Sequence, residues 1–193
     1  AGMVVCEPSG KLNSRKSKGY VRDVFQQTHM NNLQGNIGIG HVRYPTAGGV
    51  GKEFAQPMYV NTPYGISLAH NGNLTNSKKL AAELFHAERR HINTESDSEV
   101  LLNIFALELS KQEAVFPKPK DFFAAVEKTH LRINGAYAVV ALITGYGILA
   151  FRDPLGIRPL TIGVRKGENR NEYVVSSETA HFSATGFKVL RDV

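Results

Sequence analysis

The spacing of apolar residues changes along this chain in an order that limits the fold it can form. Strand-like alternation and short apolar runs occur at residues 3–6, 37–42, 58–70 and 136–176, whereas residues 76–133 show helical spacing. A parallel sheet needs helices that alternate regularly with strands, and this chain lacks that alternation. The pattern therefore predicts an α+β fold in which helices pack on antiparallel sheets.

Two pairs of strands are predicted to form hairpins because short turn-forming segments separate their members. Residues 58–61 and 65–70 form one pair, and residues 136–143 and 147–152 form the other. A tight turn is expected directly after the first hairpin, at Asn71-Gly72-Asn73. Four helices are predicted, at residues 21–33, 76–89, 100–109 and 120–133. The third follows Ser96-Asp97-Ser98-Glu99, which has the spacing of a capping box.

The composition is that of an ordinary globular protein, with 42% hydrophobic and 21% charged residues. A length of 193 residues favours one domain. The single cysteine, Cys6, excludes an intrachain disulfide and a cysteine-rich zinc site, so we expect a reducing, cytoplasmic setting. No apolar run approaches the ~20 residues of a membrane helix. The net charge of +6 is spread out rather than clustered, so we expect neither a membrane nor a nucleic-acid partner.

Two polar segments beside predicted strands carry candidate binding groups. Arg43 follows the glycine-spaced strand at residues 37–42, and its planar guanidinium could hold a carboxylate, although a surface arginine is the simpler interpretation. The Asn71 amide and the Gly72 N–H could together form an oxyanion hole. The alternative for this pair is a plain Asn-Gly turn.

Two further segments each have a structural and a functional interpretation. Asp97, at a helix start, could bind an ammonium group or could simply complement the helix dipole. The segment of residues 152–159 could be a structured turn with Asp–Arg pairing. The histidines lie in separate elements without helical ligand spacing, so no metal site is expected. Cys6 lies within a predicted strand and is expected to be a structural thiol.

Taken together, four segments closely resemble the glutaminase (class II glutamine amidotransferase) domain of the amidophosphoribosyltransferase family. The matching stretches are residues 35–48, 69–76, 96–99 and 151–160, and the resemblance extends over nearly the whole chain. Glutaminase domains that serve other acceptors, such as the hexosamine-phosphate synthases, are expected to carry a tryptophan after the loop arginine. Tyr44 follows Arg43 here, and the chain contains no tryptophan.

The resemblance implies an N-terminal-nucleophile hydrolase-like fold, a four-layer αββα sandwich. It also implies that a cysteine at the mature N-terminus attacks the side-chain amide of glutamine. Arg43 would hold the substrate α-carboxylate and Asp97 its α-ammonium, while Asn71 and Gly72 stabilise the oxyanion and Thr46 lines the glutamine pocket. The ammonia would react with phosphoribosyl pyrophosphate in a second domain to form 5-phosphoribosylamine, the first committed step of purine synthesis.

The resemblance further implies that residues 1–193 are an incomplete glutaminase domain. Family members begin Cys-Gly-Ile-Val-Gly about thirty residues before the point that matches Ala1, so the first strand and helix and the nucleophile would be missing. Cys6 does not match that nucleophile. We therefore expect no glutaminase activity from residues 1–193 alone.

The phosphoribosyltransferase domain would also be absent from this segment. We expect no cofactor here, Mg²⁺ in that absent domain, and a parent protein that is a homo-oligomer. Two alternatives remain open at this point. One is a glutaminase domain that feeds another acceptor, and the other is a non-catalytic glutamine-binding module.

Overall fold

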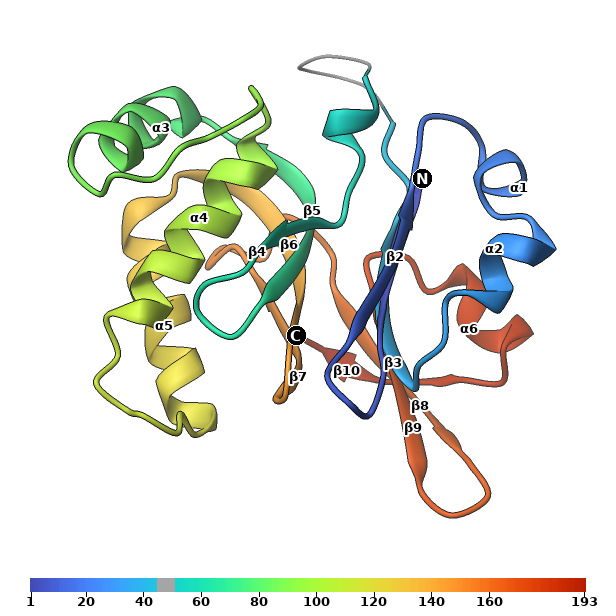
Figure 1. The fold of residues 1–193 in the computed structure, drawn as a ribbon. Coiled ribbons are helices and arrows are strands. Elements are labelled where there is room, and N and C mark those ends of the chain that lie inside the picture. The colour runs from blue at the N-terminus through green and yellow to red at the C-terminus, as the bar shows by residue number, and fades with distance from the viewer. Residues whose placement is uncertain (45–50) are drawn as a thin grey trace.

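A computed structural model describes residues 1–44 and 51–193, and its elements form four layers (Figure 1). One central layer is a four-stranded sheet in the order β4-β5-β6-β7. Its strands are β4 (Met58–Val60), β5 (Ile66–Leu74), β6 (Gly135–Ile143) and β7 (Gly147–Arg152). Both predicted hairpins, β4–β5 and β6–β7, are confirmed.

The other central layer contains two three-stranded sheets, in the orders β2-β1-β3 and β10-β8-β9. Their strands are β1 (Gly2–Cys6), β2 (Leu12–Lys16), β3 (Ile37–His41), β8 (Thr161–Lys166), β9 (Asn171–Ser176) and β10 (Lys188–Asp192). Every strand pairing among the described residues is antiparallel, as the apolar spacing predicted.

Helices form the two outer layers (Figure 1). The longer helices α3 (Ser77–His86), α4 (Asp97–Ser110) and α5 (Pro119–Arg132) lie on the side of the four-stranded sheet. The shorter helices α1 (Val21–Val24), α2 (Gln27–Asn31) and α6 (Ala180–Ala184) lie on the opposite side of the molecule. The α+β class and the αββα layering are therefore both confirmed.

The larger hydrophobic core fills the space between helices α3–α5 and the four-stranded sheet. Helix α4 is buried along most of its length, including Leu101, Leu102 and Phe105, each of which is 0% exposed. A helix that is apolar on all sides lies inside a core rather than on a surface. A smaller cluster joins the β2-β1-β3 sheet to the four-stranded sheet, and it consists of Val4, Cys6, Ile39, Ala69 and Leu142.

The start of helix α4 differs in one detail from the predicted capping box. The Ser96 hydroxyl accepts a hydrogen bond from the Ser98 N–H, as an N-cap residue does. The Glu99 carboxylate, however, accepts from the N–H groups of Asn93 and Thr94, at 2.8 Å each. Glu99 therefore fixes the loop that precedes the helix.

Some predicted elements were wrong or incomplete. The helix expected over residues 21–33 is divided into α1 and α2 because Phe25 and Gln26 have extended backbone conformations. The turn expected at residues 71–73 is instead the last part of β5, which stays paired with β6 up to Leu74. An Asn-Gly pair indicates a hairpin only when its flanking segments pair with each other. Helix α6 and strand β10 were missed.

The segment that follows β7 is a structured turn, as predicted, but its acidic residue binds backbone groups. The Asp153 carboxylate accepts hydrogen bonds from the N–H groups of Tyr137, Ile157 and Arg158, at 3.3, 2.9 and 3.1 Å. Burial acts to raise the pKa of Asp153, but these backbone donors outweigh it and hold the pKa below its usual value. The turn is therefore stabilised by a charged acceptor.

The packing of α4 predicts a large difference between two leucine truncations. Leu101→Ala removes a side chain that is 0% exposed and should lower the free energy of unfolding by about 2–5 kcal/mol. Leu131→Ala, on α5, removes a side chain that is 74% exposed and should change that free energy by less than about 0.5 kcal/mol. Equilibrium urea unfolding measures both, and equal effects would contradict this assignment of the core.

Candidate active site

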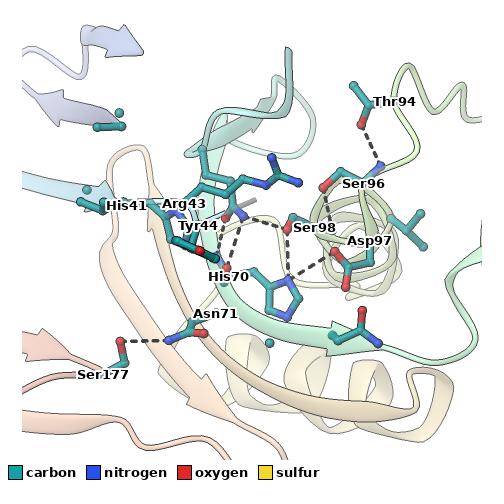
Figure 2. A pocket seen from close by; sticks show the side chains of 18 of the residues that line it. His41, Arg43, Tyr44, His70, Asn71, Thr94, Ser96, Asp97, Ser98 and Ser177 are labelled. Atoms are coloured by element: carbon teal, nitrogen blue, oxygen red, sulfur yellow. Dashed lines mark hydrogen bonds and ion pairs between the residues drawn. The ribbon is translucent and has the colours of Figure 1, made fainter. Parts of the chain in front are cut away.

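A cavity of about 1570 Å³ lies where the ends of β3, β5 and α4 approach one another (Figure 2). Arg43, Asn71, Gly72 and Asp97 all line it, so the structure gathers these predicted residues around one space. The volume exceeds the roughly 300–1,000 Å³ of a typical small-molecule pocket. The cavity is therefore larger than a bound amino acid requires.

Arg43 is carried by the segment that leaves β3. Its guanidinium carbon lies 5.4 Å from the centroid of the Phe54 ring, which is within the range of a cation–π contact. Phe54 is buried and ends the short 3₁₀ helix Lys52–Phe54. The arginine side chain therefore rests against a fixed aromatic face beside the cavity.

Asn71 and Gly72 are adjacent residues of β5. The Asn71 side chain is exposed, and its amide donates a long hydrogen bond of 3.3 Å to the Ser177 hydroxyl (Figure 2). Gly72 has φ of +154°, and a Cβ atom there would lie 2.0 Å from the Ala136 carbonyl oxygen. The backbone at this position therefore requires glycine, and it brings the Asn71 amide to the cavity wall.

Asp97 is the first residue of α4, where the helix dipole favours a negative charge. One carboxylate oxygen accepts a hydrogen bond from the Leu74 N–H at 2.9 Å. The other lies 3.9 Å from Nδ1 of His70. The side chain keeps 22% of its surface exposed, so the anchored carboxylate still faces the cavity.

A buried polar cluster of Gln56, His70 and Ser98, which also line the cavity, was not predicted as part of the site. The Gln56 side chain accepts a hydrogen bond from the His70 N–H and donates to the His70 carbonyl and to the Ser98 hydroxyl. His70 and Ser98 lie in motifs identified from the sequence, but those motifs were selected because of the adjacent residues Asn71 and Asp97. Gln56 belongs to no recognisable motif, and its burial, at 4% exposed, becomes visible only in the structure.

Together with Asp97, this cluster contains serine, histidine and aspartate side chains, but it is not a hydrolytic triad. A triad places the serine and the carboxylate on opposite nitrogens of the imidazole ring. Here Ser98 and Asp97 both lie nearest to Nδ1 of His70, at 3.1 and 3.9 Å. Nε2 of His70 is buried and has no hydrogen-bond partner among the described residues. Ser98 itself is 2% exposed, and its hydroxyl accepts a hydrogen bond from Nε2 of Gln56.

His41 and His70, two of the histidines that line the cavity, are held in the neutral form. Burial lowers the pKa of His41 to about 4, with a further contribution from His70. Burial also lowers the pKa of His70, and Asp97 opposes this effect without reversing it. Near pH 7 neither His41 nor His70 therefore adds a positive charge to this cavity wall, which Arg43 and Asp97 also line.

The remaining predicted residues do not add to the described cavity wall. Thr46 lies outside the described residues. Cys6 is buried in β1, where its thiol donates to the Glu7 carbonyl at 3.4 Å, and it does not line the cavity. Among residues 1–44 and 51–193, no three histidine, cysteine or acidic side chains gather as metal ligands would. No helix in the same residues is long and apolar enough to cross a membrane.

Comparison with known proteins identifies the family. A family model described as a glutamine amidotransferase domain matches residues 50–184. Amidophosphoribosyltransferases from Pseudomonas aeruginosa and Escherichia coli are each 55% identical to the chain, and that of Saccharomyces cerevisiae is 45% identical. Each alignment covers 100% of this chain but 38% of the relative, so the chain spans well under half of their length.

Solved structures give the same result. The glutamine phosphoribosylpyrophosphate amidotransferase of B. subtilis, complexed with ADP and GMP, is 32% identical and superposes with a TM-score of 0.80. A structure described as the allosteric regulatory enzyme of purine biosynthesis is 34% identical, with a TM-score of 0.81. Both alignments cover 100% of this chain and 38% of the solved chain. The fold, the family match and the relatives together show that this chain belongs to the glutamine amidotransferase domain family.

Proposed function

We propose that this chain is the glutaminase part of an amidophosphoribosyltransferase. In this role it hydrolyses the side-chain amide of glutamine and supplies ammonia for making 5-phosphoribosylamine from phosphoribosyl pyrophosphate. The observation that carries the proposal is that one cavity holds a cation, an anion and an amide donor on three different elements. The use of phosphoribosyl pyrophosphate, with its Mg²⁺, is proposed from the relatives and lies in the part of their length that this chain does not cover.

Recognition of glutamine follows from its charge. The free amino acid is a zwitterion near pH 7, so a selective site offers one cation and one anion at a suitable separation. Arg43 supplies a guanidinium that can pair with the α-carboxylate. Asp97 supplies a carboxylate that accepts hydrogen bonds from the α-ammonium. Thr46 is proposed to line the same pocket.

The chemistry requires a nucleophile and stabilisation of negative charge. A thiolate attacks the amide carbon, and the carbonyl oxygen becomes an oxyanion while the C–S bond forms. The Asn71 amide and the Gly72 N–H are proposed to donate hydrogen bonds to that oxyanion. The C–N bond then breaks as the nitrogen takes up a proton, ammonia leaves, and water hydrolyses the thioester to glutamate.

The nucleophile in this proposal is the terminal cysteine that the resemblance implies, not Cys6. Burial of Cys6 in β1 keeps its thiol away from the cavity. The described cavity residues therefore bind the substrate and polarise its amide. A full-length protein that releases glutamate from glutamine would support the proposal, and one that binds glutamine without turnover would favour a binding module instead.

Removal of either charged group should weaken the use of glutamine. Hydrogen bonds to charged groups contribute about 1.5–3 kcal/mol each, so Arg43→Ala should lower kcat/KM for glutamine about tenfold to over a hundredfold. Asp97→Asn should act similarly, because its amide oxygen can still accept from the Leu74 N–H while the charge is lost. Steady-state assays of glutamate release in the full-length protein measure both effects.

Two controls accompany this experiment. Arg170→Ala removes an exposed arginine from the turn between β8 and β9, away from the cavity, and should leave glutamine kinetics unchanged. Synthesis with ammonium salts in place of glutamine should survive in all the variants. Unchanged glutamine kinetics in Arg43→Ala would refute the assigned carboxylate contact, and loss of both activities would indicate a folding defect.

Asn71 should affect the transition state rather than the ground state. Asn71→Ala removes one oxyanion donor and should lower kcat by about 10²–10³ with a smaller change in KM. The fold should tolerate the change, because the Asn71 side chain is exposed and makes one long hydrogen bond of 3.3 Å. The same steady-state assay measures kcat and KM separately, and a rise in KM with unchanged kcat would be inconsistent with an oxyanion role.

A further inference from the structure

We propose that Gln56 is a positioning residue, which holds Asn71 and Asp97 in their catalytic geometry through the backbone of His70 and the hydroxyl of Ser98. This inference rests on the proposed glutaminase function and adds a residue to it. Gln56 lies outside the sequence motifs that carry the proposed substrate-binding residues, and its contacts are the evidence for its role.

The first contact completes strand β5 next to Asn71. Strand β4 pairs with β5 in the register Met58↔Leu68, and the same register would place Gln56 opposite His70. Strand β4 begins only at Met58, so its backbone pairing does not extend to His70. The Gln56 side chain supplies the hydrogen bonds to His70 instead. Its Oε1 accepts from the His70 N–H at 2.7 Å, and its Nε2 donates to the His70 carbonyl at 3.3 Å.

A side-chain amide can do this because it carries the same donor and acceptor as a backbone peptide. Both peptide groups of His70 are thereby satisfied inside the protein, where an unpaired group would cost about 1–3 kcal/mol. Asn71 is the next residue along the strand. The direction in which its amide points therefore depends on a backbone that Gln56 fixes from the side.

The second contact connects the same amide to helix α4. Nε2 of Gln56 also donates to the Ser98 hydroxyl at 2.9 Å, and that hydroxyl lies 3.1 Å from Nδ1 of His70. Ser98 directly follows Asp97 in the first turn of α4. One side chain therefore joins the strand that carries the oxyanion donors to the helix turn that carries the ammonium acceptor.

The segment around Gln56 is itself held in place. A Cβ atom on Gly2 would lie 2.1 Å from the Gln56 carbonyl oxygen, so β1 packs directly against this backbone. Two residues earlier, Phe54 contacts the Arg43 guanidinium. Phe54 and Gln56 therefore contact the segments that carry Arg43, Asn71 and Asp97.

Two substitutions test this role in the full-length protein. Gln56→Glu keeps the shape but, when ionised, removes both donated hydrogen bonds, and Gln56→Met keeps the length but removes every polar contact. A displacement of catalytic groups by about 1 Å can cost on the order of a hundredfold in rate. Both variants should lower kcat for glutamine about tenfold to a hundredfold and change KM less than about threefold.

The matched control is Gln34→Glu, the same chemical change at an exposed glutamine whose amide donates to the Asn31 carbonyl. This variant should keep the parent kcat. Ammonia-dependent synthesis should stay at the parent rate in all three variants, because it does not use the glutamine site. A merely structural residue would instead lower both activities together.

The outcomes separate this inference from the function on which it rests. A parent protein that releases no glutamate from glutamine overturns the proposed function and this inference with it. An active parent, with unchanged kcat in Gln56→Glu and Gln56→Met, overturns the positioning role alone. A change confined to KM, or equal loss of the glutamine and ammonia activities, also overturns it.

Discussion

The nine-residue antiparallel pairing of β5 with β6 is the constraint on which the candidate site depends. This pairing extends β5 beyond Leu68, its last residue paired with β4, so residues 70–74 remain part of a sheet and do not form a loop. Asn71 and Gly72, the proposed oxyanion donors, therefore have a rigid support. The N–H of Leu74, the last residue of that strand, donates to Asp97, which ties the strand to helix α4.

The elements that bury a continuous apolar face were predictable from the sequence. Both hairpins and helices α3, α4 and α5 were predicted within a few residues of their observed ends. The errors fall where tertiary contacts override local signals. Residues 71–73 have the composition of a tight turn, yet β6 offers nine pairing partners, and the strand continues. Strand β10 is exposed along its whole length, so it has no apolar alternation that could reveal it.

The candidate site likewise contains residues that were predictable from the sequence and one that was not. Arg43, Asn71 and Asp97 were identified because each lies in a motif with a clear chemical interpretation. Gln56 was not identified, because a side chain that forms hydrogen bonds in place of a backbone group produces no periodic pattern in the sequence. Its importance arises from burial among polar groups, and burial at 4% exposure is a property of the folded chain. A residue that holds other residues in place is therefore harder to predict than one that lies in a motif with a clear chemical interpretation.

The contact between Arg43 and the buried Phe54 ring has a consequence for binding entropy. Fixing a long, flexible side chain costs up to about 1.5–2 kcal/mol in lost rotamer freedom. Because the guanidinium already rests on the ring, part of that loss occurs when the chain folds and not when a ligand arrives. Under the proposed function, Phe54, which is apolar and offers no hydrogen bond to glutamine, would thus contribute to the affinity of Arg43 for the glutamine carboxylate.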